Sequence, residues 1–330
     1  MLAMVLEDGR LTATLRPVPE PGAGQVRLEI RACGVCRTDL HLLDGDLSTP
    51  GPIVPGHQVV GTVAALGEGV TTLALGQRVG VSWLGRACGR CDLCREGLEN
   101  LCKRAEFTGW TRDGGYADQV LADAAFCLPL PEAFSDLEAA PLLCAGAIGF
   151  RAWRMAAQGR VVRRLGLYGF GAAAHLLAQL AIFEGQDVYA FTRPGDTAAQ
   201  ALARSLGCVW AGSSAERPPQ PLDAAIIFAA DGALVPLALR AVDRGRAVVC
   251  AGIHMSAIPA LDYSDLWEER RVLSVANLTR VDGADYLKRA AAASVRAHIT
   301  TYGLRQAGKA LADLRAGAFT GAAVLAIRGR

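Results

Sequence analysis

The 330-residue sequence predicts an α/β protein in which a portion of short antiparallel strands precedes a doubly wound parallel sheet. Up to about Leu130, short apolar runs are separated by glycine and proline turns, which is typical of an antiparallel β-barrel or sandwich. From about Gly149, apolar strands alternate with helical segments, and this alternation is typical of a parallel sheet covered by helices. The length leaves room for about two domains.

The first portion begins with strands and turns that alternate over short distances. Residues 16–25 contain three prolines and two glycines and are expected to form a loop. A helical turn is expected from Thr38 onward, where Thr38 or Asp39 can cap it. The strands expected here, from alternating or β-branched residues, are Val5–Glu7, Leu11–Leu15, Val26–Arg31 and Val59–Leu66.

The composition argues against several classes of protein. A net charge of +2 without a long basic run is not typical of a protein with a nucleic-acid partner. The apolar runs are too short and interrupted to cross a bilayer, and charged residues follow Met1 too soon for a secretory signal. The sequence therefore predicts a cytoplasmic protein with no membrane partner. In that reducing compartment, ten cysteines need an explanation other than structural disulfides.

Four of the ten cysteines lie within one stretch of fifteen residues: Cys88, Cys91, Cys94 and Cys102. Clustered cysteines in a reducing compartment indicate a metal site before disulfides. Four thiolates close a tetrahedral zinc shell, and these short spacings let one loop wrap the ion. Because a closed shell leaves no position for substrate, a structural role is expected. The alternative, four unpaired surface thiols, is chemically hazardous.

A second set of candidate ligands, Cys36, His57 and Cys144, is spread along the chain. Thiolate and neutral imidazole are donors that suit zinc. Three protein ligands would leave one position open, as a catalytic zinc requires. Each residue alone has a plainer explanation, since a free cysteine is commonly a small buried apolar residue. The assignment therefore depends on the motifs around them.

A dinucleotide-binding fingerprint is predicted where the pattern changes. An expected strand, Val161–Tyr168, runs into a glycine turn, a helix to Glu184 and a second strand, Asp187–Phe191. This succession is the context that such a fingerprint needs. Gly169 would permit the tight turn and Gly171 the approach to a pyrophosphate at the helix N-terminus, with Ala174 in the third position.

The remaining chain is expected to continue the alternation. Residues 300–330 are expected to be turn-rich and to end in an apolar run, Ala322–Ile327, that could return to the first domain. The other expected strands are Asp223–Ala230, Arg246–Ala251 and Val272–Ala276, and the other expected helices are Ala233–Val242 and Ala284–Ala293.

Taken in order and spacing, these motifs resemble those of the zinc-dependent medium-chain alcohol dehydrogenases, over essentially the whole chain. The resemblance rests on Cys36–His41, Gly56-His57, the four-cysteine loop, Cys144 and the turn at Gly169. It implies reversible hydride transfer between a primary or simple secondary alcohol, or its aldehyde or ketone, and a nicotinamide cofactor. It also implies a homo-oligomer, either a dimer or a tetramer.

The resemblance implies three parts of the chain. Residues 1–148 would form a GroES-like β-barrel catalytic domain that carries both zinc sites. Residues 149–298 would form a Rossmann cofactor-binding domain with a doubly wound parallel sheet. Residues 299–330 would return to the catalytic domain.

The resemblance also implies roles for single residues. Cys36, His57 and Cys144 would hold a catalytic zinc that polarises the substrate oxygen, and the four-cysteine loop a structural zinc, giving two ions per chain. Thr38 would hydrogen-bond the substrate alcohol, and His41 would be the outer end of a proton relay. Asp39 would orient a zinc-bound histidine. Arg37 would face the cofactor pyrophosphate, an ordinary surface arginine being the alternative.

Three departures from the family pattern bear on the cofactor and the metal. Gln58 follows His57 where relatives commonly have a carboxylate, and Gly321 is followed by alanine where many have arginine. At the end of the second strand of the fingerprint, Thr192-Arg193 replaces the acidic residue that bonds the NAD ribose. Arg193 can instead pair with a 2′-phosphate, so NADP is predicted over NAD. Gly252 is a further candidate at the cofactor.

Trp83, Trp110 and Leu143 fall near positions that line the substrate pocket in relatives, and their bulk predicts modest aliphatic or aromatic substrates. The alternative is that they are ordinary core residues. Two other functions stay open: a reductase of activated double bonds on the same fold, and a non-catalytic zinc and nucleotide sensor. No ligand role is predicted for His175, His254 and His298.

Overall fold

A computed structural model describes residues 1–327 of the chain, which form two compact units. The first unit comprises Met1–Ala147, Asn277–Ala291 and the segment from Arg296 onward, and the second comprises Ile148–Ala276 and Ala292–Val295. Residues 328–330 of the predicted C-terminal segment lie outside the described residues. Within the described range, no helix has the length and apolar character needed to cross a membrane.

The main sheet of the first unit has seven strands, in the order β16-β17-β3-β4-β5-β9, with β8 also paired to β3. Burial along β3 alternates, so Val26, Leu28 and Ile30 point into the core while the residues between them are half-buried. The strands are β3 (Gln25–Val35), β4 (Val59–Leu66), β5 (Arg78–Val81), β8 (Gln119–Asp123), β9 (Cys127–Pro129), β16 (Ile299–Gly303) and β17 (Ala322–Ala326).

Smaller elements complete the first unit. Two antiparallel pairs lie outside the main sheet, β1 (Leu2–Glu7) with β2 (Arg10–Leu15) and β6 (Leu84–Arg86) with β7 (Glu106–Phe107). The expected strands of this portion are therefore confirmed, with ends that differ by a few residues. Its helices are α1 (Arg37–Leu43), α2 (Asp92–Arg95), α3 (Asp136–Pro141), α9 (Arg280–Ala292) and α10 (Ala307–Ala316).

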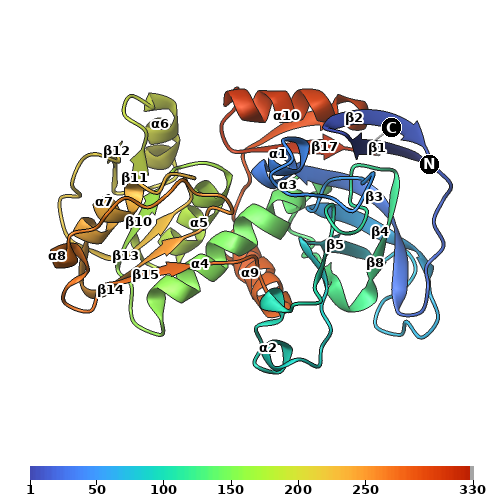
Figure 1. Cartoon of the computed structure of the whole chain (residues 1–330), viewed down its shortest axis with the longest axis horizontal. Coiled ribbons are helices and arrows are strands. Elements are labelled where there is room, and N and C mark those ends of the chain that lie inside the picture. The colour runs from blue at the N-terminus through green and yellow to red at the C-terminus, as the bar shows by residue number, and fades with distance from the viewer. Residues whose placement is uncertain (328–330) are drawn as a thin grey trace. The chain divides into compact units, whose positions relative to one another are not determined.

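The C-terminal segment adds a strand to the first unit's sheet. Strand β17 pairs antiparallel with β3, placing Leu325 opposite Cys33, and Figure 1 shows the red β17 among the blue strands of the N-terminal part. The expectation that residues 300–330 are turn-rich is wrong, because α10 occupies ten of them. Ala307, Ala310 and Leu311 are buried at helical spacing, a periodicity that the abundance of alanine obscured.

The second unit is built on a six-stranded parallel sheet in the order β12-β11-β10-β13-β14-β15. The predicted alternation of strands and helices is confirmed, and the structure adds α6 and β12 to it. The strands are β10 (Arg164–Tyr168), β11 (Asp187–Thr192), β12 (Trp210–Ser213), β13 (Leu222–Ile227), β14 (Val242–Cys250) and β15 (Arg271–Ser274), and the helices α4 (Ala147–Ala157), α5 (Ala172–Phe183), α6 (Thr197–Ser205), α7 (Leu234–Ala241) and α8 (Tyr263–Leu266).

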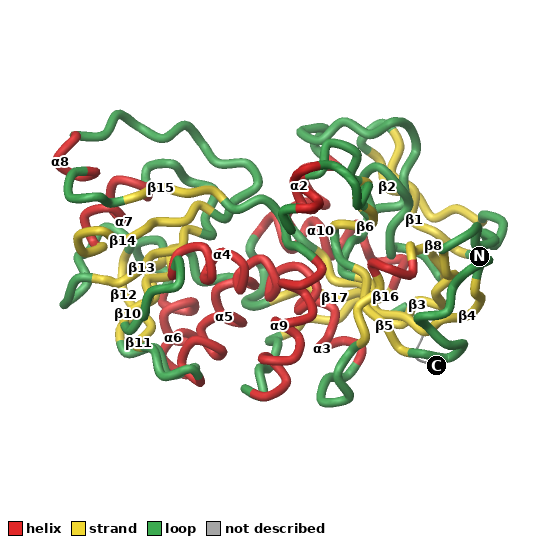
Figure 2. The backbone as a smooth tube through the Cα atoms, turned by 90° about the horizontal axis from the view of Figure 1, so that it is seen from below, coloured by secondary structure: helices red, strands yellow, loops and turns green. Residues whose placement is uncertain are grey.

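The strand order decides which helices share a face of this sheet. The chain runs outward in one direction from β10 to β12 and in the other from β13 to β15. Right-handed crossovers therefore place α5 and α6 on one face and α7 on the other. Figure 2 shows α5 and α6 next to each other along the sheet, and the two helices are in contact.

An ion pair is one of the contacts that join residues 277–291 to the first unit, whereas the sequence placed these residues in the cofactor domain. The Glu99 carboxylate accepts the backbone N–H of Arg280 at 2.8 Å and its Nε–H at 3.0 Å. The Arg280 guanidinium also lies 4.5 Å from the Phe126 ring centroid. Burial raises the pKa of Glu99, but the hydrogen bonds from Arg280 lower this pKa by a larger amount. The net shift is therefore downward.

Replacing Glu99 by glutamine should lower the stability of the protein by about 2 kcal/mol, because Arg280 loses a charged acceptor. A carboxyl group whose pKa is lower in the folded than in the unfolded protein stabilises the folded state at pH values above its unfolded pKa of roughly 4.3. This stabilisation is lost as the pH falls through the folded-state pKa. We therefore expect the difference in unfolding midpoint between wild type and Glu99→Gln to be full at pH 7 and to shrink in acid. The exposed Glu96 provides the control Glu96→Gln, and equal midpoints for the two variants would contradict the prediction.

Candidate active site and zinc centres

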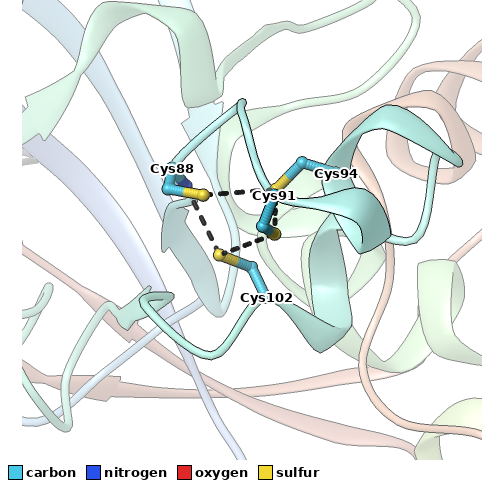
Figure 3. A group of neighbouring side chains, drawn as sticks. All are labelled: Cys88, Cys91, Cys94 and Cys102. Atoms are coloured by element: carbon cyan, nitrogen blue, oxygen red, sulfur yellow. Dashed lines mark hydrogen bonds between the residues drawn. The ribbon is translucent and has the colours of Figure 1, made fainter.

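The four cysteines of the short loop converge on one point in the first unit. Their Sγ atoms are separated by 3.5 Å (Cys91 to Cys94) and by 3.9 Å (Cys88 to Cys94, and Cys91 to Cys102). Figure 3 shows the four sulfur atoms turned toward one another from the loop that carries α2. All four are free thiols, and the sulfurs are too far apart for the bond of about 2.05 Å in a disulfide.

These separations fit a bound zinc ion. A tetrahedron with Zn–S arms of about 2.3 Å has edges of about 3.8 Å, which matches the observed spacing. Backbone N–H groups face the sulfurs as well: those of Cys88 and Arg104 lie 3.5 Å and 3.4 Å from the Cys102 Sγ. Hydrogen bonds from the Arg90 and Cys91 backbone hold the pKa of Cys88 at about 5, whereas burial and the contact with Cys91 raise the pKa of Cys94 to about 12.

Strand pairing brings the second set of candidate ligands together. Cys36 directly follows β3 and His57 lies just before β4, and the antiparallel register of these strands pairs Cys33 with Val59. Cys144 lies in a π-helical turn, Leu142–Gly146, between α3 and α4. The ligand atoms of Cys36, His57 and Cys144 lie within 4.8 Å of one another. Among the described residues, only this cluster and the four-cysteine loop form such a group.

The electrostatics of this cluster favour a cation. Burial lowers the pKa of His57, but Asp39 and Cys36 raise it by more, to about 10. A hydrogen bond from Cys144 holds the pKa of Cys36 well below its usual value, and His57 acts in the same direction. The same contact, together with burial, raises the pKa of Cys144. The site therefore accommodates positive charge between a carboxylate and a thiolate.

His57 carries a buried ring nitrogen that is placed to bind a metal ion. The side chain is fully buried, and its Nε2 has no hydrogen-bond partner of normal geometry among the described residues. Its Nδ1 lies 3.3 Å from Asp39 Oδ1, an ion-pair distance at which neither atom has hydrogen-bond geometry. A buried polar atom is rarely left without a partner. Two cysteine sulfurs and one free imidazole nitrogen make a donor set that fits zinc.

The predicted catalytic residues of α1 surround this cluster. Asp39 is buried, and its Oδ2 accepts the backbone N–H of Cys36 at 2.9 Å. Thr38 is also buried, with its Oγ1 3.7 Å from Cys36 Sγ. His41 follows Thr38 by three residues, so both lie on one face of the helix, and its Nδ1 is 2.8 Å from Asp46 Oδ2. Arg37 is exposed at the first position of α1.

A stack of three aromatic rings adjoins His57. Trp83 meets His57 edge to face, with ring centroids 4.9 Å apart. Trp83 stacks on Trp110 at 5.6 Å and on Phe107 at 5.4 Å, and the Trp110 indole N–H donates to the Ser48 carbonyl at 2.9 Å. Phe107 was missed from the sequence, because its place beside Trp83 depends on the pairing of β6 with β7.

Other predicted or overlooked residues lie in the core of the first unit. Leu143 is buried, and its methyl groups occupy the space where a side chain at Gly80 would be. Gln58 is buried against Gly34. Tyr116 was not predicted: its hydroxyl donates to Asp39 Oδ2 at 3.0 Å, and burial raises its pKa well above the usual value, so it stays a donor. No sequence motif around Tyr116 indicated this contact.

The predicted cofactor turn lies in the second unit, between β10 and α5. Gly169 has φ +87°, and a Cβ there would lie 2.9 Å from the Ala229 nitrogen, so the turn requires glycine. Gly171 precedes α5, and a Cβ built on it would meet no atom within 4 Å, which leaves the helix N-terminus open. Ala174 is fully buried in α5.

The end of β11 presents Arg193. The Thr192 hydroxyl is buried and engaged, accepting from Gln200 Nε2 at 3.0 Å, with the Gly212 carbonyl 3.3 Å away. Arg193, by contrast, has an exposed side chain at the carboxyl end of this strand. Gly252 follows β14 at the same edge of the parallel sheet, because β10, β11 and β14 run in the same direction.

Comparisons with known proteins agree on one family. The alcohol dehydrogenase GroES-like domain model matches residues 22–132. A probable alcohol dehydrogenase of Mycobacterium tuberculosis, AdhA, is 45% identical over 329 residues, which cover 98% of this chain and 94% of the relative. An alcohol dehydrogenase of a Moraxella species is 33% identical over 318 residues and 93% of each chain.

A solved structure extends the likeness to both units. Acetophenone reductase from Geotrichum candidum, in complex with NAD, is similar with a TM-score of 0.87 and 26% identity, over 98% of this chain and 96% of that one. With the parallel sheet, these comparisons confirm the predicted fold class, a GroES-like domain together with a Rossmann-like domain. The chain belongs to the medium-chain alcohol dehydrogenase family.

Proposed function

We propose that the protein is a zinc-dependent alcohol dehydrogenase. It would transfer hydride reversibly between a nicotinamide cofactor and a primary or simple secondary alcohol, or the corresponding aldehyde or ketone. The observation that carries this proposal is the convergence of Cys36, His57 and Cys144, in which the buried His57 Nε2 has no hydrogen-bond partner of normal geometry among the described residues. Three ligands leave a fourth position for substrate.

Each residue of the site has a proposed task. Cys36, Cys144 and His57 Nε2 would hold the metal, and Asp39 would keep the His57 Nδ1 proton in place. A zinc ion bound there supplies a Lewis acid for the substrate oxygen, and the bound cofactor supplies or accepts the hydride.

The proton path is proposed to run along one face of α1. The Thr38 hydroxyl lies beside Cys36 Sγ and would hold the proton of the substrate hydroxyl, since a hydroxyl both donates and accepts. His41 is one turn further along the helix, and its side chain is 20% exposed. It would exchange the proton with solvent.

The four-cysteine loop is proposed to hold a second zinc with a structural task, which gives two ions per chain. Its tetrahedral shell is complete without substrate. A closed site of this kind contributes folding energy to the loop that wraps it.

The aromatic stack is proposed to form one wall of the substrate pocket. Trp83 and Trp110 are held nearly parallel, with 14° between their ring planes, and Trp83 contacts the proposed metal ligand His57. Rigid parallel rings favour a flat substrate over a short aliphatic one. The likeness to an acetophenone reductase supports an aromatic carbonyl compound as one acceptable substrate.

The cofactor is proposed to be NADP in preference to NAD. The turn at Gly169 and Gly171 would take the pyrophosphate, with Arg37 and Gly252 as further proposed contacts. The exposed Arg193 has the charge that a 2′-phosphate requires, and β11 ends without a carboxylate that would repel it. Since the Geotrichum relative was solved with NAD, the preference rests on this chain's own residues.

Replacing one ligand in each proposed zinc site should have different effects on turnover and on stability. In zinc-loaded protein, Cys36→Ser should lower the zinc content from two ions to one and reduce aldehyde turnover by roughly 1,000-fold, while binding of NADPH persists. Cys91→Ser should also remove one ion but lower the melting temperature instead. Metal analysis, initial rates and cofactor titration measure these outcomes. Full turnover in Cys36→Ser would refute the catalytic assignment, and a zinc-loaded wild type without turnover would favour the sensor.

If the aromatic stack lines the substrate pocket, it should affect the KM for aromatic aldehydes more than the KM for aliphatic ones. Trp110→Ala removes one ring of the stack, so the KM for benzaldehyde should rise by about fivefold, while that for acetaldehyde changes little. Initial rates with both aldehydes measure the effect, with Trp267→Ala, at an exposed tryptophan in the second unit, as the control. Equal changes for the two aldehydes would show that the stack is only part of the core.

The charge of Arg193 should set the cofactor preference. Arg193→Asp should raise the KM for NADPH by about 10- to 100-fold and leave that for NADH unchanged or lower, because a charged hydrogen bond is replaced by repulsion. Arg163→Asp provides a charge-matched control, since Arg163 is exposed just before β10, at the opposite edge of the sheet. An unchanged ratio of the two KM values would remove Arg193 from the cofactor site.

A further inference from the structure

Tyr116 is built into the segment that carries His57. Its backbone N–H donates to the Pro55 carbonyl at 2.9 Å, and its own carbonyl accepts the N–H of Met4 at 2.8 Å. Its ring fills the space beside Gly56, where an added Cβ would lie 2.4 Å from the ring edge, and Gly56 has φ +95°. The phenol is fully buried. Backbone and ring together therefore fix where the hydroxyl points.

The hydroxyl points at the carboxylate that faces His57. Tyr116 Oη donates to Asp39 Oδ2 at 3.0 Å, the same oxygen that accepts the Cys36 N–H at 2.9 Å. The other oxygen, Oδ1, lies 3.3 Å from His57 Nδ1. Two donors thus hold one oxygen of the carboxylate, and the second oxygen is left for the imidazole.

The different contacts of the two carboxylate oxygens determine which His57 nitrogen carries the proton. A carboxylate held through one oxygen cannot rotate freely, so Oδ1 stays near Nδ1, at the observed 3.3 Å. The proton of a neutral His57 is then kept on Nδ1, and Nε2 presents its lone pair. A buried tyrosine hydroxyl usually has some hydrogen-bond acceptor, but the acceptor of Tyr116 is the carboxylate that faces a proposed metal ligand.

We propose that Tyr116 is a positioning residue of the metal centre, which holds Asp39 so that His57 offers Nε2 to the zinc ion. The inference rests on the proposed zinc site. Removal of a group that contacts a metal-bound histidine typically costs 10- to 100-fold in metal affinity. Tyr116 acts one hydrogen bond further away, so we expect an effect near the lower end of that range.

The test replaces Tyr116 by phenylalanine, which keeps the ring and removes the hydroxyl. Zinc release from the loaded enzyme to a chromogenic chelator is followed in wild type and variant, with Cys36→Ser and Cys91→Ser used to assign the two phases. We expect release from the Cys36, His57 and Cys144 site to be about tenfold faster and release from the four-cysteine site to be unchanged. In protein with cobalt at the first site, the visible absorption should shift.

Tyr302 provides a matched control. Its hydroxyl also donates to a carboxylate, Asp313 Oδ2 at 2.8 Å, in the same unit but outside the ligand cluster. Tyr302→Phe should alter the melting temperature without altering either release phase. If Tyr116→Phe behaves in the same way, Tyr116 has only a structural role and the inference is overturned.

A double-mutant cycle tests whether Tyr116 acts through Asp39. In an Asp39→Asn background, the further change Tyr116→Phe should leave the release rate within about twofold, because the carboxylate that it holds is already gone. An undiminished tenfold effect in that background would overturn the inference. A wild-type protein that binds one zinc, with Cys36→Ser unable to lower that number, would overturn the catalytic zinc site itself, a result distinct from failure of Tyr116 alone.

Discussion

The buried Asp39 carboxylate is the point on which the geometry of the site depends. It lies in the first turn of α1 and accepts the N–H of Cys36, so it holds the start of the helix to the proposed metal ligand that precedes it. The same group faces His57 and accepts from Tyr116. A buried carboxylate is costly unless it is paired, and the groups that face this one come from its own helix start and from two other segments, at His57 and Tyr116. Satisfying one charge therefore brings those segments into a single arrangement.

The two cysteine-rich sites differ in the kind of structure that holds them. In the four-cysteine loop, the backbone of one short segment brings four sulfurs together, and little else of the fold is needed. At the other site, the ligands come from the end of one strand, the approach to its neighbour and a π-helical turn. This second site offers three ligands instead of four, and three protein ligands leave one position of a zinc ion open.

Features encoded locally were predictable from the sequence. The cysteine spacing, the glycine turn before α5 and the alternation of strands with helices all depend on residues close together in the chain, and the structure contains each of them. The helix α10 was missed because alanine is frequent throughout the chain and its short apolar stripe does not stand out. Residues 277–291 group with the first unit, and their contact between Glu99 and Arg280 joins residues 181 positions apart, which short spacings in the sequence do not indicate.

The sequence by itself determined the fold class, the family and the candidate ligands, because these follow from residue type and short spacing. Only the tertiary structure decided which groups surround those ligands. Tyr116 and Asp39 are 77 positions apart, and Phe107 stacks on Trp83 across the antiparallel pairing of β6 with β7. Such contacts depend on strand register and on how buried charges find partners, and both emerge only once the whole first unit has folded.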